Sequence, residues 1–251
     1  MNDLRLPASP RVILMRSTTS TNDEARRLAG QGAPDGTTVI ADFQTRGRGR
    51  LGRTWHAPAG RNLNMSQVVR GRHGSLGLLP MAAGLAVQAT IGRFLPYTLA
   101  ASLKWPNDVI VMGFKLAGIL AEIVDDHAAV LGIGVNINTR ASDFPTSLRR
   151  PAASVMMLAG RRTNRSVFTL LLLEELDRYK RLWQTESAKL VRLYTRRCGT
   201  LGKSVSVNLP GERIEGTAIS IDPDGALVVR DEAGNDRRIL AGDVVERPAR
   251  K

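Results

Sequence analysis

Hydrophobic and polar residues alternate along this chain in a way that predicts both strands and helices. Runs rich in β-branched and apolar residues at 38–43 and 64–69 are typical of strands. Three further runs, at residues 109–112, 116–124 and 129–137, are separated by very short gaps, which favour antiparallel pairing between neighbours. Because strands and helices do not alternate regularly, the pattern predicts an α+β fold.

Helical spacing appears in several other segments. Thr21 followed by Glu24 forms a capping-box pattern, which predicts a helix that begins just after Ser20. The apolar stretch at residues 76–95 is interrupted by proline, glutamine and arginine, so it indicates a buried helix rather than a membrane span. Two more helices are predicted at residues 166–183 and 186–197.

The pattern of hydrophobic and polar residues changes after Gly199. Four short β-rich runs divided by turn residues follow, at 204–209, 213–221, 226–230 and 236–240. About fifty residues of this kind predict a small barrel or sandwich. We therefore expect two domains, a larger α+β domain at residues 1–198 and a small β-barrel domain at residues 199–251.

Composition narrows the class of protein. The chain has 251 residues, 43% hydrophobic content and one cysteine, Cys198, which excludes an internal disulfide and favours a buried thiol. The beginning of the sequence lacks the pattern of a secretory signal, so we expect a cytoplasmic protein without membrane association. The net charge of +13 suggests a nucleic-acid partner, but much of the excess lies along predicted helices and is interpreted as solvated surface.

Residues 44–55 form the segment with the most distinctive chemistry. Four arginines alternate with glycines and are followed by Trp55. Glycines allow backbone amides to approach an anion, and guanidinium groups suit phosphate or carboxylate oxygens. Taken alone, the segment could be an anion-binding loop, a solvated basic turn or a nucleic-acid contact, and charged runs of this kind are more often solvated surface than ligand sites.

Four other motifs decide between these alternatives. They are Ser-Thr-Asn at residues 20–22, Lys-Trp-Pro-Asn-Asp-Val at 104–109, Lys-Leu-Ala-Gly-Ile-Leu-Ala-Glu at 115–122 and Gly-Ile-Gly-Val-Asn-Ile-Asn at 132–138. Together with the arginine segment, in this order, they resemble the catalytic domain of biotin protein ligases. The resemblance implies a class II synthetase-like domain with a mixed, largely antiparallel sheet and packed helices, followed by an SH3-like barrel. Since fewer than twenty residues precede Ser20, we expect the short form without an N-terminal DNA-binding domain.

The resemblance also implies an activity. Biotin and ATP would form biotinyl-5′-AMP and pyrophosphate, and biotin would then pass to a lysine of the biotin carboxyl carrier protein of acetyl-CoA carboxylase. Mg²⁺ would accompany ATP, the enzyme would be a monomer or homodimer, and it would have no specific nucleic-acid partner. Two rivals remain at this stage: a lipoate ligase, and a basic nucleic-acid-binding module that uses the same loop.

Site residues follow from the matched motifs. Biotin would contact Ser20, Thr21, Asn22, Gln44, Arg48, Gly49, Arg50, Lys115 and Gly118. The first three also fit a plain helix N-cap. ATP would contact Arg48, Arg50, Arg53, Trp55, Lys104, Asn107, Lys115 and Asn136. Trp55 fits an anchor of the loop almost as well as an adenine contact.

Lys115, Arg48 and Arg50 are the expected catalytic residues. A compact ammonium placed just before a strand would reach both the biotin carboxylate and the α-phosphate, although lysines at hairpin edges are ordinarily only solvent-exposed. Asp108 would hold a lysine or a magnesium ion, or would simply belong to a turn beside Pro106. Leu51 departs from the family pattern, which often has an arginine at this position, and so lowers the charge of the loop.

Overall fold

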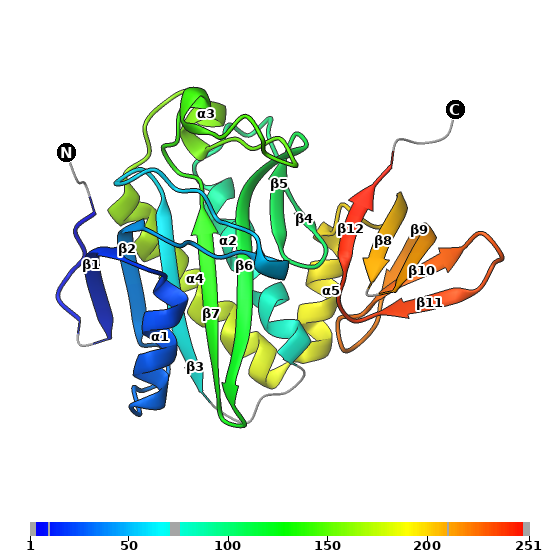
Figure 1. The fold of residues 1–251 in the computed structure, drawn as a ribbon, viewed down its shortest axis with the longest axis horizontal. Helices are drawn as coiled ribbons and strands as arrows, with labels where there is room; N and C mark the ends of the chain where they lie inside the picture. Colours follow the sequence, from blue (N-terminus) through cyan, green and yellow to red (C-terminus); the bar gives the residue numbers. More distant parts are fainter. Residues whose placement is uncertain (1–3, 10, 71–75, 210, 248–251) are drawn as a thin grey trace.

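The computed structural model describes residues 4–9, 11–70, 76–209 and 211–247 and confirms the predicted α+β fold class (Figure 1). A seven-stranded sheet runs in the order β1-β2-β3-β7-β6-β5-β4. Only β1 and β2 pair in parallel, so this sheet is mixed and largely antiparallel. Its strands are β1 (Val12–Thr18), β2 (Thr38–Gln44), β3 (Leu63–Arg70), β4 (Ala101–Lys104), β5 (Asp108–Val111), β6 (Phe114–Asp125) and β7 (Ala128–Val135).

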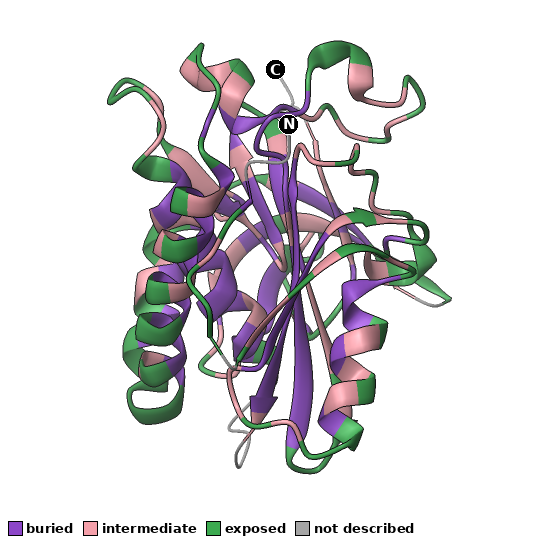
Figure 2. Cartoon of the chain, turned by 90° about the vertical axis from the view of Figure 1, so that its left-hand side faces the viewer, coloured by how far each residue is buried: buried purple, intermediate pink, exposed green. Residues whose placement is uncertain are grey.

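Helices cover both faces of this sheet (Figure 2). On one face α1 (Thr21–Gly30) packs over β2, β3 and β7 through a small apolar cluster that includes Ala25 and Val130. On the other face lie α2 (Leu79–Gly92), α4 (Arg165–Thr185) and α5 (Ser187–Arg197). The short α3 (Val155–Ala159) connects β7 to α4. None of the helices in the described ranges is long and apolar enough to cross a membrane.

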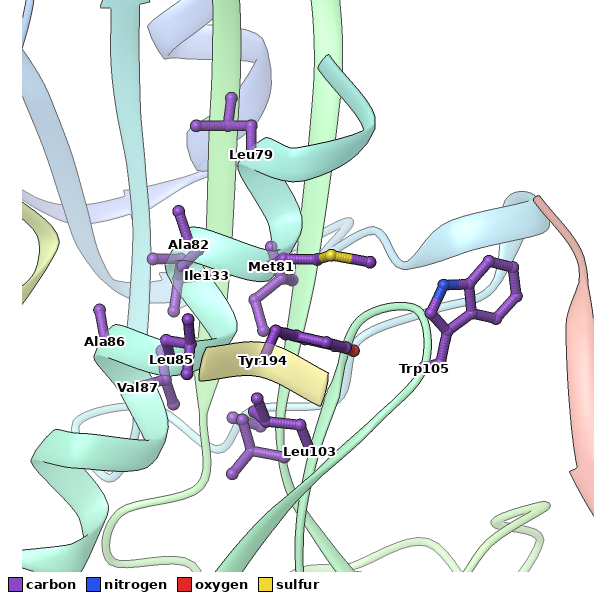
Figure 3. Close-up of a cluster of buried hydrophobic side chains, with 14 of the residues drawn as sticks. Leu79, Met81, Ala82, Leu85, Ala86, Val87, Leu103, Trp105, Ile133 and Tyr194 are labelled. Carbon is purple, nitrogen blue, oxygen red and sulfur yellow. The ribbon is translucent and has the colours of Figure 1, made fainter. Parts of the chain in front are cut away.

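The larger core is built around α2. This helix is apolar on all sides, as expected for a helix buried between a sheet and other helices. Leu79 and Leu85 from α2 meet Ile133 of β7, Leu103 of β4 and Tyr194 of α5, all at most 2% exposed (Figure 3). The core therefore packs against one face of the sheet. The opposite face, which carries α1, is the one that forms the site.

The C-terminal unit is a five-stranded antiparallel sheet in the order β11-β10-β9-β8-β12. Its strands are β8 (Ser204–Leu209), β9 (Glu212–Ile221), β10 (Leu227–Asp231), β11 (Asp236–Ile239) and β12 (Asp243–Glu246). Trp105, only 2% exposed, donates its indole N–H to the carbonyl of Gly225 at 3.0 Å. Side chains of both units belong to one continuous apolar cluster. The division at residue 198 remains a prediction.

Candidate active site

A cavity of about 530 Å³ lies on the α1 face of the larger sheet. It is enclosed by the start of α1, the segment after β2, the strands β6 and β7, and the start of β12. Residues from all five sequence motifs meet here. Those expected from the sequence that line it are Ser20, Thr21, Asn22, Gln44, Arg48, Gly49, Arg50, Arg53, Trp55, Asn107, Asp108, Lys115, Gly118 and Asn136.

Polar side chains at the start of α1 form a buried network. Ser20 occupies the N-cap position, but its side chain makes no capping hydrogen bond. The Thr21 amide and hydroxyl both donate to Gln44 Oε1, at 2.7 and 3.0 Å. Ser66 Oγ lies 2.7 Å from Thr21 Oγ1. The predicted residues therefore do more than begin a helix, because they present fixed donors and acceptors to the cavity.

Asn22 extends this network toward β6 and β7. Its amide nitrogen donates to Glu122 Oε2 at 2.6 Å, and its oxygen lies 2.6 Å from Ser66 Oγ. The side chain rests on Gly132, where a Cβ atom would lie 2.2 Å from Asn22 Oδ1. Glycine is therefore required at this point of β7 if Asn22 is to keep its position. Ser66 and Glu122 were not predicted, although Glu122 ends one of the motifs.

The arginine–glycine loop, residues 46–55, folds as a small hairpin over the cavity. The Gly49 amide donates to the Arg53 carbonyl at 2.7 Å, and the Trp55 amide donates to the Gly47 carbonyl at 2.9 Å. At its tip Leu51 takes a left-handed backbone conformation with φ of 56° and is 67% exposed. The loop thus has a defined shape in which its arginines point toward different neighbours.

Three arginines of the loop lie against the walls of the cavity. Arg48 is 2.7 Å from Asp23 and 3.2 Å from Glu122, both on the α1 side. Arg50 donates to Asn107 Oδ1 at 3.3 Å, and its burial lowers the pKa of its guanidinium. Because burial disfavours the charged form, an anion beside Arg50 would be stabilised.

Trp55 closes the loop against the floor of the site. Its indole N–H donates to Asn64 Oδ1 at 3.2 Å. The ring covers Gly134, where a Cβ atom would lie 2.4 Å from Trp55 Cε2. Lys115 Nζ lies 5.9 Å from the ring centroid, within the range of a cation–π contact. This geometry fits the alternative in which Trp55 anchors the loop.

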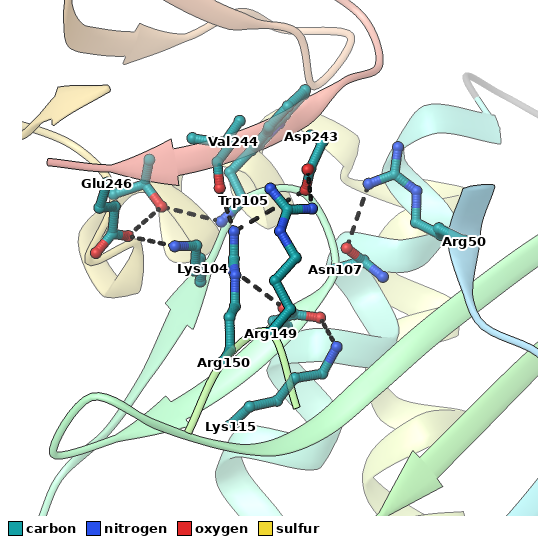
Figure 4. Close-up of polar contacts among 12 residues, drawn as sticks. Arg50, Lys104, Trp105, Asn107, Lys115, Arg149, Arg150, Asp243, Val244 and Glu246 are labelled. Carbon is teal, nitrogen blue, oxygen red and sulfur yellow. Dashed lines mark hydrogen bonds and ion pairs between the residues drawn. The ribbon is translucent and has the colours of Figure 1, made fainter. Parts of the chain in front are cut away.

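Lys115 and Asp108 form the central ion pair (Figure 4). Lys115 Nζ lies 2.6 Å from Asp108 Oδ1, and Arg150 lies 3.6 Å from the other oxygen of the same carboxylate. The pairing of β5 with β6 sets this contact, since it aligns Asp108 with Gly118. Asn136 is buried nearby and accepts a hydrogen bond from Asn62 at 3.2 Å.

Asp243, at the start of β12, was not predicted as a site residue. Its carboxylate lies 2.8 Å from Arg53 of the loop and also contacts Arg149 and Arg150. Burial on its own raises the pKa of Asp243, but hydrogen bonds from Arg53 and Arg149 bring it below its usual value. The C-terminal unit therefore holds the loop directly.

Lys104 is the one expected site residue, among those that the structure describes, that does not line this cavity. It lies 3.4 Å from Glu246 of β12 and faces a second cleft.

Comparisons with known proteins agree with this geometry. Residues 14–138 match the biotin/lipoate A/B protein ligase family, and residues 200–247 match the biotin protein ligase C terminal domain. The chain is 38% identical to the biotin–[acetyl-CoA-carboxylase] ligase of Mycobacterium tuberculosis over 92% of its own length and 87% of that protein. The chain belongs to the biotin protein ligase family.

Solved structures place this ligase in the same fold. The biotin protein ligase of Aquifex aeolicus in complex with biotin and ATP has a TM-score of 0.82 and 27% identity, with 96% of this chain and 100% of that chain covered. The biotin protein ligase of Leishmania major in complex with biotinyl-5-AMP has a TM-score of 0.66 and 27% identity, covering 93% and 100%. The expected family and fold class of this ligase are confirmed.

Proposed function

We propose that this ligase activates biotin with ATP and transfers it to a lysine of a biotin carboxyl carrier protein. The observation that carries the proposal is the position of Lys115, whose ammonium faces the cavity between the polar network at α1 and the arginine–glycine loop. One end of the cavity offers neutral hydrogen-bonding groups and the other offers cations. This division suits a substrate with a polar ring at one end and a carboxylate at the other.

The biotin ring binds beside α1 in this proposal. Ser20, Thr21 and Asn22 supply polar groups, Gln44 holds Thr21, and the missing side chain at Gly118 leaves space beside Lys115. Gly49 allows the loop backbone to come close to the ligand. The carboxylate of biotin then points toward Lys115, Arg48 and Arg50.

Activation consists of an attack by a biotin carboxylate oxygen on the α-phosphorus of ATP. A new P–O bond forms, the bond to the β-phosphate oxygen breaks, and pyrophosphate leaves with the electron pair. Negative charge builds up around phosphorus, where Lys115 acts as a compact cation and the arginines as forked donors. Arg48 is paired with the carboxylates of Asp23 and Glu122, which the phosphate would replace.

The nucleotide lies toward β5 and the C-terminal unit. Arg53 is proposed to support the phosphates, and Trp55, Asn107 and Asn136 to border the base and ribose. In the second step the uncharged amine of the acceptor lysine attacks the carbonyl carbon of the adenylate. The bond from this carbon to the phosphate oxygen breaks, AMP leaves with the electron pair, and the nitrogen releases a proton to solvent. The loop excludes water from this anhydride, which would otherwise be hydrolysed.

Asp108 does not fit as a ligand for Mg²⁺. One carboxylate oxygen is 2.6 Å from Lys115 Nζ and the other is 3.6 Å from Arg150. Within the described residues no group of three acidic, histidine or cysteine side chains could hold a metal ion. We therefore assign no step to a protein-bound metal, and Mg²⁺ that enters with ATP would be held by phosphate oxygens and water.

The test is isotope exchange between pyrophosphate and ATP. We expect exchange that depends on biotin and is not supported by lipoate, followed by transfer of biotin to a purified carrier domain. Exchange supported by lipoate instead of biotin, or no exchange with either acid, would contradict the proposal. Omission of the carrier separates the two steps, because exchange requires only the first.

A further inference from the structure

Asn62, just before β3, joins two segments that border the active site. The residue is fully buried and does not line the cavity. Its side-chain oxygen Oδ1 accepts from the Ile137 backbone N–H at 3.1 Å and from the Thr139 hydroxyl at 2.6 Å. Its nitrogen Nδ2 donates to Asn136 Oδ1 at 3.2 Å. Both polar atoms of this side chain are therefore bonded to the segment that follows β7.

The backbone of that segment fixes which end of the Asn62 amide points in which direction. The N–H of Ile137 can only donate, so the atom that faces it has to be the Asn62 oxygen. The Asn62 nitrogen then faces Asn136, and because this nitrogen can only donate, the Asn136 atom opposite it has to be the oxygen. The orientation of the Asn136 amide thus follows from a single backbone donor.

The Asn136 nitrogen has one N–H available for a ligand. Asn136 is 3% exposed and lines the cavity. Within the part of the chain that the structure describes, its Nδ2 atom donates to the Lys115 carbonyl alone, at 3.5 Å. An amide nitrogen carries two N–H bonds, so the other can donate to a ligand. A ligand that offers an acceptor here gains a hydrogen bond, whereas one that offers a donor leaves a polar group unpaired.

Arg165 of α4 holds Asn62 in place. The Arg165 side chain is completely buried, and its Nε donates to the Asn62 carbonyl at 3.1 Å. The same guanidinium lies 2.7 Å from Asp42 of β2. A buried charge is tolerated when it is paired and hydrogen-bonded, as this one is. Asn62 cannot move without breaking these contacts, so the amide that orients Asn136 is itself fixed.

We propose that Asn62 is a positioning residue, which turns the Asn136 amide so that its nitrogen donates to an acceptor atom in the base or ribose of ATP. This inference rests on the proposed function, in which Asn136 borders the nucleotide. Asn62 does not touch the substrate, but it decides which atom of Asn136 the nucleotide meets. The pair Asn62–Asn136 therefore contributes to the specificity of the site for the nucleotide and not to the binding of biotin.

The test compares Asn62→Asp with Asn62→Ala in the full chain. Aspartate keeps an oxygen that accepts from Ile137 and Thr139, and these two hydrogen bonds favour its ionised form. An ionised carboxylate cannot donate to Asn136, so Asn136 turns its nitrogen toward position 62 and its oxygen toward the nucleotide. Alanine only removes the constraint on the Asn136 amide.

The measurement is pyrophosphate–ATP exchange at saturating biotin and a pH of about 8, where the new carboxyl group is ionised. We expect the KM for ATP to rise about tenfold or more in Asn62→Asp and by a smaller factor in Asn62→Ala. A purely structural role predicts the reverse order, since aspartate keeps two of the three hydrogen bonds and alanine keeps none. The affinity for biotin alone, measured by calorimetry, should stay within about twofold of the unmodified chain.

Asn138→Asp and Asn138→Ala are the matched controls. Asn138 is also buried, at 2% exposed, but its side chain bonds the backbone of Thr163 at 2.9 Å in both directions. A KM for ATP in Asn62→Asp within about twofold of its control, or below that of Asn62→Ala, would overturn the role of Asn62. If Asn62→Asp does not fold, Asn62→Ala decides against its own control by the same criterion. Absence of exchange in the unmodified enzyme would contradict the proposed function instead.

Discussion

At the scale of single residues, Lys115 is the side chain whose removal has the sharpest expected effect. Its ammonium contacts Asp108 and faces Trp55, so it is held in place before any substrate binds. Lys115→Ala should slow adenylate formation by about 10²-fold or more, because one preorganised charge opposite the α-phosphate is lost. Biotin affinity should fall far less.

Single-turnover formation of biotinyl-5′-AMP checks this expectation. Lys115→Arg should restore little, since a planar guanidinium does not replace a compact ammonium in this space. Lys189→Ala, on an exposed helix surface, controls for the loss of a lysine elsewhere. An Ala variant that forms the adenylate at nearly the normal rate would remove Lys115 from the catalytic residues.

Gly134 provides a residue-scale test of the loop anchor. A Cβ atom at this position would lie 2.4 Å from the Trp55 ring, so Gly134→Ala should displace Trp55 and loosen the loop. We expect faster trypsin cleavage after Arg48 or Arg50 and weaker biotin-dependent exchange. Gly92→Ala is the control, because nothing lies within 4 Å of its added Cβ atom. Equal cleavage in the two variants would contradict the anchoring role of Trp55.

At the scale of elements, β12 holds the loop through one carboxylate. Asp243→Asn weakens the contacts with Arg53, Arg149 and Arg150 together, so the loop of the empty enzyme should be cleaved several-fold faster. Saturating biotin and ATP should restore slow cleavage, since the phosphates offer the arginines a new anion. Asp236→Asn removes an exposed pair with Arg230 in the same unit and serves as the control.

The helices and longer strands could be predicted because each has its own pattern. The runs at 109–112, 116–124 and 129–137 became β5, β6 and β7, and the helix after Ser20 became α1. β4 and β12 have four residues each and were missed. The equally short β5 and β11 could be predicted because the turns at Gly113 and Gly234 mark where they end or begin. β1 was missed because it forms an edge strand that continues directly into the Ser-Thr-rich start of α1.

The site residues likewise fall into those that the sequence predicts and those that it does not. Those within a motif, such as Lys115 and Thr21, were expected at the cavity, and they line it. Asp243 could not be predicted, because its partners Arg149 and Arg150 lie more than ninety residues away and meet it only after the two units pack together. Lys104 lies within a motif, but the turn that follows β4 directs it to the second cleft.

At the scale of the whole molecule, we expect the two units to stabilise each other, because they share one apolar cluster. Trp105 fills their contact, and Gly225 leaves no room for a side chain beside Leu78 and Met81. Trp105→Ala should lower the free energy of unfolding by about 3–5 kcal/mol, the usual cost of emptying a buried aromatic site. Chemical denaturation followed by circular dichroism measures this change.

The reactivity of the single cysteine, Cys198, measures how well the contact between the two units is closed. Cys198 is buried at the junction, and burial raises the pKa of its thiol, so little reactive thiolate is present near neutral pH. A thiol reagent should therefore react slowly with the native enzyme and at least about tenfold faster with Trp105→Ala. Equal rates would show that the substitution does not open the junction.

The distribution of the three tryptophans gives the enzyme an intrinsic optical probe. Trp105 and Trp183 are 2% and 4% exposed, while Trp55 is half-buried in the loop and borders the cavity. Indole emission shifts with the polarity around the ring. Trp105 also borders the cavity but is buried, so most of a spectral change on addition of biotin or ATP should come from the more exposed Trp55. Ligand binding and loop closure can then be followed in real time without an attached dye, with Trp55→Phe as the reference that measures the contribution of Trp105.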